Sequence, residues 1–423
     1  MGLKRKLKRL KFKLRKAVFQ FLPGVLHVGR RALTRAVLMH GRPWIEKAFS
    51  DNADGRLAFE REMLAQKLFK GRPWLMPMVE RGPRKLAMPR FSEAQRLDVA
   101  LPLMSESERL DAAQQAVHAA WEIFDQGYAH RDLHAKNLFW VQGQLIVTDL
   151  ETLEAYPPES VPAFPESYDI VARGLPSPHS TAHMCYTSGH EFALQRTLQV
   201  PLARALETVQ QTFKDRLRTE SATFKTASDR HTLRAERIYG SFTLPHLSVG
   251  AEEVQRNSAG RLAKFGVTAE ILRGKRLLDL GCFCGAMTFQ AQEFQPAFSL
   301  GIEYDAAKVE VTRSIVRYTG VRNMEFRQGD VDLLEADKLG GDFDVVFCLA
   351  INRHVKDPAR MYQLLGRVTG EVLFFEGNGG TDVEDALQQL RGAGFKSVDF
   401  LGMSDDDCLP SNNNRPLFVA RRR

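Results

Sequence analysis

The chain has 423 residues, of which 44% are hydrophobic, and its 59 Lys and Arg against 51 Asp and Glu give a formal net charge of +8. This length favours two or three domains, and the composition is ordinary for a globular protein. Nine of the cations fall within residues 1–16, so the rest of the chain is nearly neutral and is not a general polyanion binder. No run of about 18 apolar residues occurs, which excludes a hydrophobic span across a membrane.

Residues 1–22 predict a basic amphipathic leader. Apolar side chains recur there at steps of three and four, and cations fill the other faces of the helix that this spacing implies. Such a helix can lie on an anionic membrane surface with its apolar face among the headgroups. Membrane docking is therefore predicted. A basic tail without a role and an arm for another polyanion are the alternatives, with nucleic acid the less favoured partner.

The five cysteines are scattered along the chain and show no metal-ligand spacing. This pattern is typical of reduced thiols in a cytoplasm. Together with the leader, it predicts a cytoplasmic protein held at the inner face of the membrane.

Residues 23–232 are expected to form a first domain of short strands and helices. Apolar periodicity predicts a strand, a helix, two strands and a long helix, over residues 43–49, 56–69, 74–79, 85–89 and 107–126. The first strand carries Lys47, and the helix after it carries Glu60 and Glu62. A further helical stripe over 202–217 is assigned to the core of the same domain.

The segment after the long helix reads His-Arg-Asp-Leu-His-Ala-Lys-Asn over residues 130–137, and a short strand then ends at Asp149. A phosphoryl-transfer site needs a carboxylate to orient the attacking hydroxyl and oxygen ligands for magnesium. Asp132 is the candidate base, and Asn137 and Asp149 are the candidate Mg²⁺ ligands.

Phosphoryl transfer also needs a cation on the nucleotide phosphates. Lys47 is the candidate for contact with ATP, braced by Glu62 in preference to Glu60.

The order of these parts resembles that of protein kinases over roughly residues 25–230. It is most similar to compact bacterial kinases that phosphorylate lipopolysaccharide sugars, whose loop tends to read H-x-D-L-H-x-x-N. Three departures are a missing glycine-rich loop near 24–40, Leu-Glu after Asp149, and His134 where protein kinases often carry Lys. The resemblance implies a protein-kinase-like α+β fold and a sugar acceptor rather than a protein. An inactive kinase is the alternative.

From about residue 270 the pattern becomes strand–helix alternation. Seven strands are predicted, over residues 275–280, 297–302, 324–327, 344–349, 372–375, 397–401 and 416–420. A helix is expected to start at Asp357-Pro358, and another at a capping box over 381–384. Alternation of this kind implies a parallel sheet covered by helices, with ligands beyond the carboxyl ends of its strands.

The first of these strands runs into Leu-Asp-Leu-Gly-x-x-x-Gly, with Asp279, Gly281 and Gly285 at the positions where a backbone approaches a cofactor. Glu303, at the end of the next strand, is placed to accept hydrogen bonds from two ribose hydroxyls. Asp330, after the third strand, could meet an adenine amine. A nicotinamide dinucleotide is disfavoured because the G-x-G-x-x-G spacing is absent.

This pattern resembles class I methyltransferases over residues 240–423, and the domain is bounded at 233–423. The resemblance implies a Rossmann-like, seven-stranded sheet that binds S-adenosylmethionine. The preamble over 238–245 resembles a segment that closes the cofactor site in some bacterial relatives. His354 is the candidate base after the fourth strand. Arg353 and Arg415, with the asparagines at 412–414, could hold an anionic acceptor.

The two domains together are similar in content to bacterial kinase–methyltransferases that cap O-antigen polysaccharides, with the order exchanged. The resemblance implies a bifunctional enzyme acting on a saccharide or lipid-linked glycan, where a phosphate made by the first domain could be methylated by the second. Two alternatives remain open: a methyltransferase with a non-catalytic kinase-like binding domain, and a nucleic-acid methyltransferase guided by the basic leader.

Overall fold

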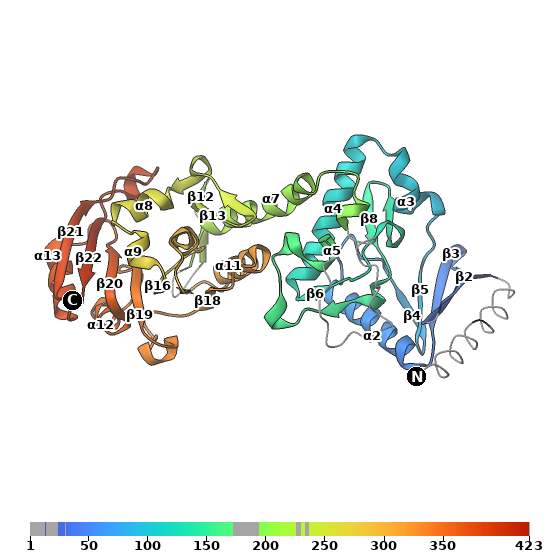
Figure 1. The fold of residues 1–423 in the computed structure, drawn as a ribbon, viewed down its shortest axis with the longest axis horizontal. Helices are drawn as coiled ribbons and strands as arrows, with labels where there is room; N and C mark the ends of the chain where they lie inside the picture. The colour runs from blue at the N-terminus through green and yellow to red at the C-terminus, as the bar shows by residue number, and fades with distance from the viewer. Residues whose placement is uncertain are drawn as a thin grey trace. The chain divides into compact units, whose positions relative to one another are not determined.

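The computed structural model describes residues 24–29, 31–171, 194–225, 230–232 and 237–422, together with Lys13. The chain divides into two compact units, Met1–Val209 and Gln210–Arg423 (Figure 1). The predicted leader, apart from Lys13, lies outside the described residues. Within the described part, no helix is both long enough and apolar enough to cross a membrane.

The first unit begins with a five-stranded antiparallel sheet in the order β1-β2-β3-β5-β4. These strands are β1 (Val25–Val28), β2 (Ala32–Met39), β3 (Arg42–Phe49), β4 (Val79–Gly82) and β5 (Lys85–Pro89). Helix α2 (Ala53–Leu68) contributes Ala58 to an apolar cluster with Phe49 and Leu86 of the sheet. The predicted first strand and helix are therefore confirmed.

The strand predicted over 74–79 is wrong. The segment lies outside any strand until β4 begins at Val79, and Leu75 forms only an isolated bridge with Val147. Pro73 directly precedes this segment and Pro77 lies within it, and proline supplies no backbone N–H to a strand ladder. Trp74 is instead buried against Phe69, with ring centroids 5.2 Å apart.

The rest of the first unit is mainly helical. Helix α4 (Glu106–Asp125) starts at a capping box of Ser105 and Glu108 and buries an alanine-rich face. Two short antiparallel pairs follow it: β6 (Tyr128–Ala129) with β9 (Glu154–Ala155), and β7 (Leu138–Val141) with β8 (Gln144–Val147). The shorter helices are α3 (Leu97–Ala100), α5 (Tyr168–Val171) and α6 (Leu194–Thr197).

Helix α7 (Leu202–Ser221) contains the division between the units, which was expected at 232/233. Its second half packs on the second unit: the Phe213 ring lies 5.1 Å from that of Tyr318, and Lys214 Nζ lies 2.8 Å from Glu253 Oε1. A single amphipathic stripe cannot reveal that its two halves serve different cores.

The second unit is built on a sheet in the order β18-β17-β16-β19-β20-β22-β21. Its strands are β16 (Arg276–Leu280), β17 (Phe298–Glu303), β18 (Met324–Gln328), β19 (Phe343–Leu349), β20 (Thr369–Glu376), β21 (Ser397–Met403) and β22 (Pro416–Arg421). The first five are mutually parallel, and β22 is antiparallel to both neighbours. The predicted parallel sheet with a final hairpin is confirmed.

Helices cover both faces of this sheet. The side chains of Leu277 and Leu278 point to opposite faces, and each joins a separate apolar cluster. One cluster includes residues of α12 (Pro358–Val368) and α13 (Val383–Gly392), and the other includes residues of α8 (Ser258–Lys264), α9 (Ala269–Leu272) and α10 (Ala286–Gln290). Helix α11 (Ala306–Thr319) packs on β18.

The two predicted helix starts have different outcomes. Asp357 caps α12 as expected, since its side chain accepts a hydrogen bond from Arg360 N at 3.0 Å and Pro358 follows it. Helix α13 is capped by Asp382, not by Thr381 as predicted, because Asp382 Oδ1 accepts from Asp385 N at 2.8 Å. Aspartate and threonine are both good N-caps, so adjacent candidates leave the register open.

Short strands precede the sheet: β10 (Thr223–Lys225), β11 (Arg230–Thr232), β12 (Ile238–Gly240), β13 (Phe242–Leu244), β14 (Leu247–Val249) and β15 (Val254–Arg256). The last of them, β15, and helix α8 after it are tied to the sheet by a buried ion cluster around Glu376. Arg256 Nη1 lies 2.7 Å from Glu376 Oε1, and Arg261 Nη2 lies 2.5 Å from Oε2. Arg415 lies 3.4 Å from Oε1, and Arg256 also binds Asp406 at 2.8 Å.

These arginines determine the ionisation of Glu376. Burial would raise the pKa of its carboxyl, but Arg261 and Arg256 lower that pKa to about 2. Glutamate has a pKa of about 4.3 in an unfolded chain, so the cluster stabilises the fold above that pH. The stabilisation is lost as the pH falls from about 4.3 towards 2.

We expect Glu376→Gln to lower the stability of the second unit by about 3–5 kcal/mol at neutral pH, because it leaves buried arginines without a full countercharge. Glu371→Gln is the matched control on the same strand. Its pair with Lys275 is partly exposed, at 2.6 Å, and should be worth less than about 1 kcal/mol. The wild type should lose stability as the pH falls from about 4 to about 2, because Glu376 becomes protonated. Glu376→Gln should lose much less stability over this pH range.

The measurement is thermal unfolding of the full chain. All four tryptophans lie between residues 44 and 140, so fluorescence reports on the first unit and circular dichroism on both. Glu376→Gln should lower the unfolding temperature of the second unit, which circular dichroism detects and fluorescence does not. The unfolding temperature of the first unit, seen by fluorescence, should stay unchanged. An equal loss in Glu371→Gln, or a shift of the fluorescence transition, would contradict the assignment.

Candidate functional site

Lys47 is the centre of an acidic cluster in the first unit. It lies on β3, where its Nζ pairs closely with Asp149 and lies 2.7 Å from Glu151 Oε2 and 3.8 Å from Glu62 Oε1. The structure thus brings together three residues predicted from the sequence: Lys47, Glu62 and Asp149. Burial would lower the pKa of the lysine, but the three acids hold it well above its usual value.

Glu62 and Glu60 differ in their surroundings. Glu62 is fully buried, and no described residue hydrogen-bonds to either of its carboxylate oxygens. Burial therefore raises its pKa to about 8, although Lys47 acts in the opposite direction. Glu60 is exposed to solvent. Of the two candidates for bracing the lysine, Glu62 is the one that lies beside it.

Asp132 and Asn137 face each other across one tight loop. Asn137 Nδ2 donates to the backbone oxygen of Asp132 at 2.9 Å and to its carboxylate at 3.3 Å. His134 Nε2 lies 3.4 Å from the other carboxylate oxygen. The loop therefore holds the Asp132 side chain between an amide and an imidazole.

Buried Asp169 fixes the start of this loop. Its two carboxylate oxygens accept hydrogen bonds from the backbone N–H of His130 and Arg131, at 2.7 and 2.8 Å. Arg131 has a left-handed backbone with φ 67°, and its guanidinium lies 2.9 Å from Glu154. His130 Nε2 lies 2.9 Å from the backbone oxygen of Thr148, directly before Asp149.

Sequence reasoning missed Glu151. Its carboxylate binds Lys47 on one oxygen and Arg31 Nη1 on the other, both at 2.7 Å. The Leu-Glu pair after Asp149 was visible as a departure from the protein-kinase pattern. Only the fold shows that this glutamate shares the lysine.

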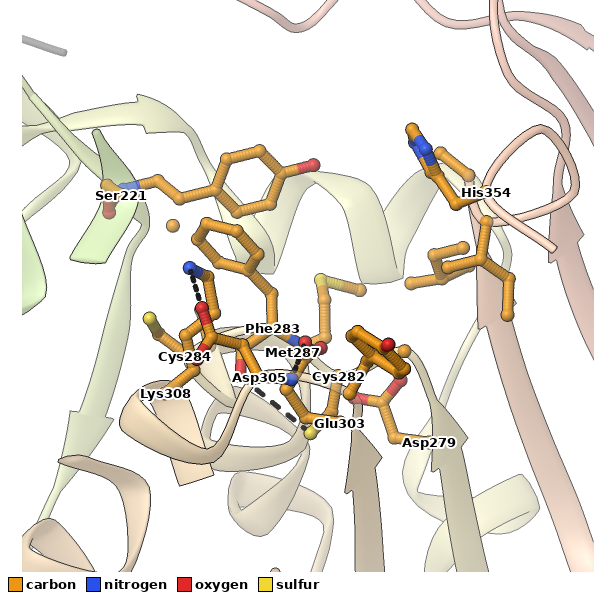
Figure 2. Close-up of a pocket in the computed structure, with 18 of the residues that line it drawn as sticks. Ser221, Asp279, Cys282, Phe283, Cys284, Met287, Glu303, Asp305, Lys308 and His354 are labelled. Atoms are coloured by element: carbon orange, nitrogen blue, oxygen red, sulfur yellow. Dashed lines mark hydrogen bonds and ion pairs between the residues drawn. The ribbon is translucent and has the colours of Figure 1, made fainter. Parts of the chain in front are cut away.

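The second unit has a cavity of about 840 Å³ at the carboxyl ends of its parallel strands (Figure 2). The predicted residues Asp279, Gly281, Glu303, Asp330 and His354 all line it. Gly285 is not among the lining residues. It takes the left-handed conformation that ends the turn, with φ 76°, before α10.

The turn after β16 needs glycine at residue 281. Its φ is 72°, and a Cβ there would come within 2.4 Å of Ile351 Cγ2. The backbone N–H groups of Gly281 and Cys282 both donate to Ile302 O, at 2.8 and 3.0 Å. Phe283 has φ 55°, and its N–H donates to Glu303 Oε2 at 2.9 Å. The turn is thus held against the carboxyl end of β17 by three backbone N–H groups.

The acids of the cavity are not equally available to a ligand. Asp279 Oδ2 accepts from Thr288 Oγ1 at 2.6 Å, and burial raises its pKa to about 6. Glu303 binds the Phe283 and Asp305 backbone N–H groups, and burial raises its pKa as well. Asp330 uses Oδ1 to accept from Asp332 N at 3.0 Å.

His354 lies on the opposite side of the cavity from Glu303 (Figure 2). Burial and the nearby Arg415 lower the pKa of its imidazole, which favours the neutral ring. Its Nε2 lies 3.4 Å from Asn378 Nδ2. Arg353, Arg415 and Asn412 also line the cavity, whereas Asn413 uses its amide to bind the backbone of Asp407.

Lys308 and Tyr239 are two cavity residues that the sequence did not single out. Lys308 is buried, donates to Thr223 O at 2.7 Å and lies 4.6 Å from the centre of the Phe283 ring (Figure 2). Tyr239 packs its ring 4.9 Å from that of Phe283, and its N–H donates to Ser221 Oγ at 2.9 Å. Both therefore hold the end of α7 and its continuation against the glycine turn.

Comparison with known proteins places a family match on this part of the chain. Residues 271–375 match the model of a methyltransferase domain. A ubiquinone biosynthesis O-methyltransferase of Acinetobacter baumannii is 36% identical over 106 residues, which are 24% of this chain and 44% of that protein. One from Azotobacter vinelandii is 35% identical over the same shares. The chain thus spans less than half the length of these relatives.

Among solved structures, the N-terminal domain of EvdMO1 with S-adenosylhomocysteine bound is similar over 51% of this chain and 97% of that domain, with 17% identity and a TM-score of 0.36. The order of the strands and the family match agree on the fold of the second unit. This unit has the class I methyltransferase fold, and it contains a methyltransferase domain.

Proposed function

We propose that the chain is a bifunctional enzyme that methylates an oxygen of a saccharide or lipid-linked glycan with S-adenosylmethionine and phosphorylates the same or a related acceptor with ATP. Modification of this kind would cap a surface polysaccharide. The methyl-transfer half is carried by one observation, the cavity in which the Gly281 turn meets Glu303. The relatives named above, whose names specify O-methyl transfer, support an oxygen acceptor.

The residues of the cavity fit S-adenosylmethionine. Gly281 lines the cavity and carries no side chain of its own, as close approach of a backbone to a cofactor requires. Glu303 ends β17 and would accept hydrogen bonds from ribose hydroxyls, and Asp330 would meet the adenine amine. The bound cofactor would supply an electrophilic methyl group, so these residues need only orient it and exclude water.

The first unit fits a magnesium nucleotide. The side chain of Asp149 is 37% exposed, so its carboxylate is open to a cation, and Asn137 uses only its Nδ2 within the loop. Among the described residues, no group of three or more His, Cys, Asp or Glu forms a metal site. Magnesium often binds through one or two carboxylates plus phosphates and water, so a sparse ligand set suits it.

Each of the candidate site residues of the first unit then has its own role in phosphoryl transfer. Asp132 would accept the proton of the attacking hydroxyl, held in place by Asn137 and His134. Lys47 would leave Asp149 for the nucleotide phosphates while Glu62 keeps it aligned. The convergence of Lys47 with Asp149 and Glu62 carries this half of the proposal.

We also propose that residues 1–22 dock the enzyme on an anionic membrane at its cytoplasmic face, where lipid-linked acceptors lie. The support is the apolar periodicity and the nine cations of this segment. Deletion of residues 2–16 should abolish co-sedimentation with vesicles that contain anionic lipid. Unchanged sedimentation would remove the membrane from the proposal.

Gly281→Ala should weaken binding of S-adenosylhomocysteine and lower the stability of the second unit. A left-handed backbone costs an alanine about 1–2 kcal/mol, and the new Cβ also meets Ile351. Gly266→Ala is the matched control, because Gly266 has the same φ of 72° with nothing within 4 Å of its Cβ position. It should lose stability only. Calorimetric titration that finds equal binding in both variants would argue against a cofactor at this turn.

Label transfer tests both halves of the proposal. The full chain, given ATP labelled in its γ-phosphate and S-adenosylmethionine labelled in its methyl group, should transfer both labels to a lipopolysaccharide extract. Asp132→Ala should reduce phosphate transfer by about 10²–10⁴-fold, since a positioned base supplies about that factor. Methyl transfer to an acceptor that needs no prior phosphate should persist.

The matched control is Asp111→Ala on the exposed face of α4, which should transfer both labels normally. Methyl label alone from the wild type would favour a methyltransferase with a non-catalytic first unit. Methyl label on RNA, lost on deletion of residues 2–16, would favour a nucleic-acid methyltransferase. Full phosphate transfer by Asp132→Ala would refute the role of Asp132.

A further inference from the structure

The cavity of the second unit offers several groups that could take a proton from an acceptor hydroxyl. The carboxylates of Asp279 and Glu303 already accept hydrogen bonds from the protein, and the Glu303 position suits the cofactor ribose. Among the other lining residues, His354 and Tyr239 come from different elements, and each carries a group that can accept a proton. The residues around each of them decide which is the better proton acceptor.

The side chain of Asn378 has a fixed orientation next to His354. Its Oδ1 accepts from Arg353 N at 3.0 Å, and its Nδ2 donates to Ala350 O at 2.8 Å. The amide nitrogen therefore also faces His354 Nε2, at 3.4 Å. An amide nitrogen only donates, so this contact favours the tautomer in which Nε2 is unprotonated.

This contact opposes protonation of His354. A proton on Nε2 would point at the amide N–H of Asn378, and Arg415 already disfavours an imidazolium here. Accepting a proton would thus require the ring to break its contact with Asn378 beside a cation. His354 is better suited to orient a ligand than to act as a base.

A positive environment also surrounds Tyr239, but there it favours the charged form of the side chain, a phenolate. It lies on β12, next to Gly240, where a Cβ would come within 2.6 Å of the Ala286 side chain, so the strand lies tightly on α10. Its ring is held against Phe283 of the glycine turn, and its backbone is anchored by Ser221. No described residue forms a hydrogen bond with its hydroxyl, which belongs to a cavity-lining side chain.

The charged groups that act on Tyr239 come from four segments of the second unit. Arg256 ends β15, Arg261 lies on α8 and Arg415 precedes β22, while Glu376 ends β20. Burial alone would raise the pKa of the phenol, and Glu376 acts in the same direction. The arginines outweigh both, so the pKa lies below its usual value.

We propose that Tyr239 accepts the proton of a neutral acceptor hydroxyl in this cavity, so that the methylated atom is a hydroxyl oxygen and not the oxygen of a phosphate. This inference rests on the methyl transfer proposed above. The acceptor oxygen forms a bond to the methyl carbon as the carbon–sulfur bond breaks. The sulfonium becomes a neutral thioether, and the hydroxyl proton passes to the Tyr239 phenolate and then to solvent.

The first test is a titration that needs no acceptor. The ultraviolet absorbance of tyrosinate, followed against pH in the full chain, should show one of the eight tyrosines ionising below the usual value of about 10. This component should be absent from Tyr239→Phe and present in Tyr362→Phe, a buried tyrosine of α12 that does not line the cavity. An unchanged titration in Tyr239→Phe would overturn the proposal.

The second test is methyl transfer to a lipopolysaccharide extract. Tyr239→Phe should transfer about 10²–10⁴-fold less label than the wild type, while its affinity for S-adenosylhomocysteine, measured by calorimetry, stays close to wild type. Intact binding excludes simple misfolding. Tyr362→Phe should transfer label normally.

The two hypotheses fail in different ways. If the wild type binds S-adenosylhomocysteine but labels no saccharide, the proposed acceptor is wrong and the titration decides on Tyr239. If Tyr239→Phe labels saccharide as fast as the wild type, the base assignment alone is wrong. That second result would favour an acceptor that is already an anion.

Discussion

The second unit depends on one buried carboxylate that three arginines share. Glu376 ends β20, and its partners come from before the sheet, through Arg256 and Arg261, and from the last loop, through Arg415. Breaking such a pair leaves a buried charge without a partner, so these segments cannot move independently. The same arginines line or border the cavity and act on Tyr239. A structural ion cluster therefore also determines the electrostatics of the proposed acceptor side.

The first unit uses charge differently. Lys47 is one cation among Glu62, Asp149 and Glu151, and Arg31 supplies the second positive charge through Glu151. Burial raises the pKa of Glu62 to about 8, so Asp149 and Glu151 are the acids that balance these two cations at neutral pH. Asp149 is the partly exposed one, and a further cation would meet the cluster there. A buried arrangement of this kind is poor evidence for stability and more typical of a functional site.

The sequence predicted those features of the fold that depend on residues close together in the chain. The alternation of strands and helices, the glycine at residue 281 and the caps near α12 follow from periodicity and backbone geometry. The strand predicted over 74–79 does not form, because Pro77 lies within the segment and removes a backbone N–H from any strand ladder. Glu151 binds Lys47, and Glu376 binds arginines that are 120 and 115 residues away in the chain. No spacing in the sequence predicts these pairs. Pairing across such distances is decided by the fold.

Tyr239 is a candidate site residue that the sequence alone does not identify. It lies in a preamble that was assigned only to closing the cofactor site, and a lone tyrosine in a short strand has no motif. Its proposed role depends on its neighbours. Asn378 contacts Nε2 of His354, the other candidate base, and arginines from separate elements stabilise a Tyr239 phenolate. Both effects act through space between elements far apart in the chain. The chemistry of this cavity is therefore set less by the residues that a motif would mark than by the charges the fold places behind them.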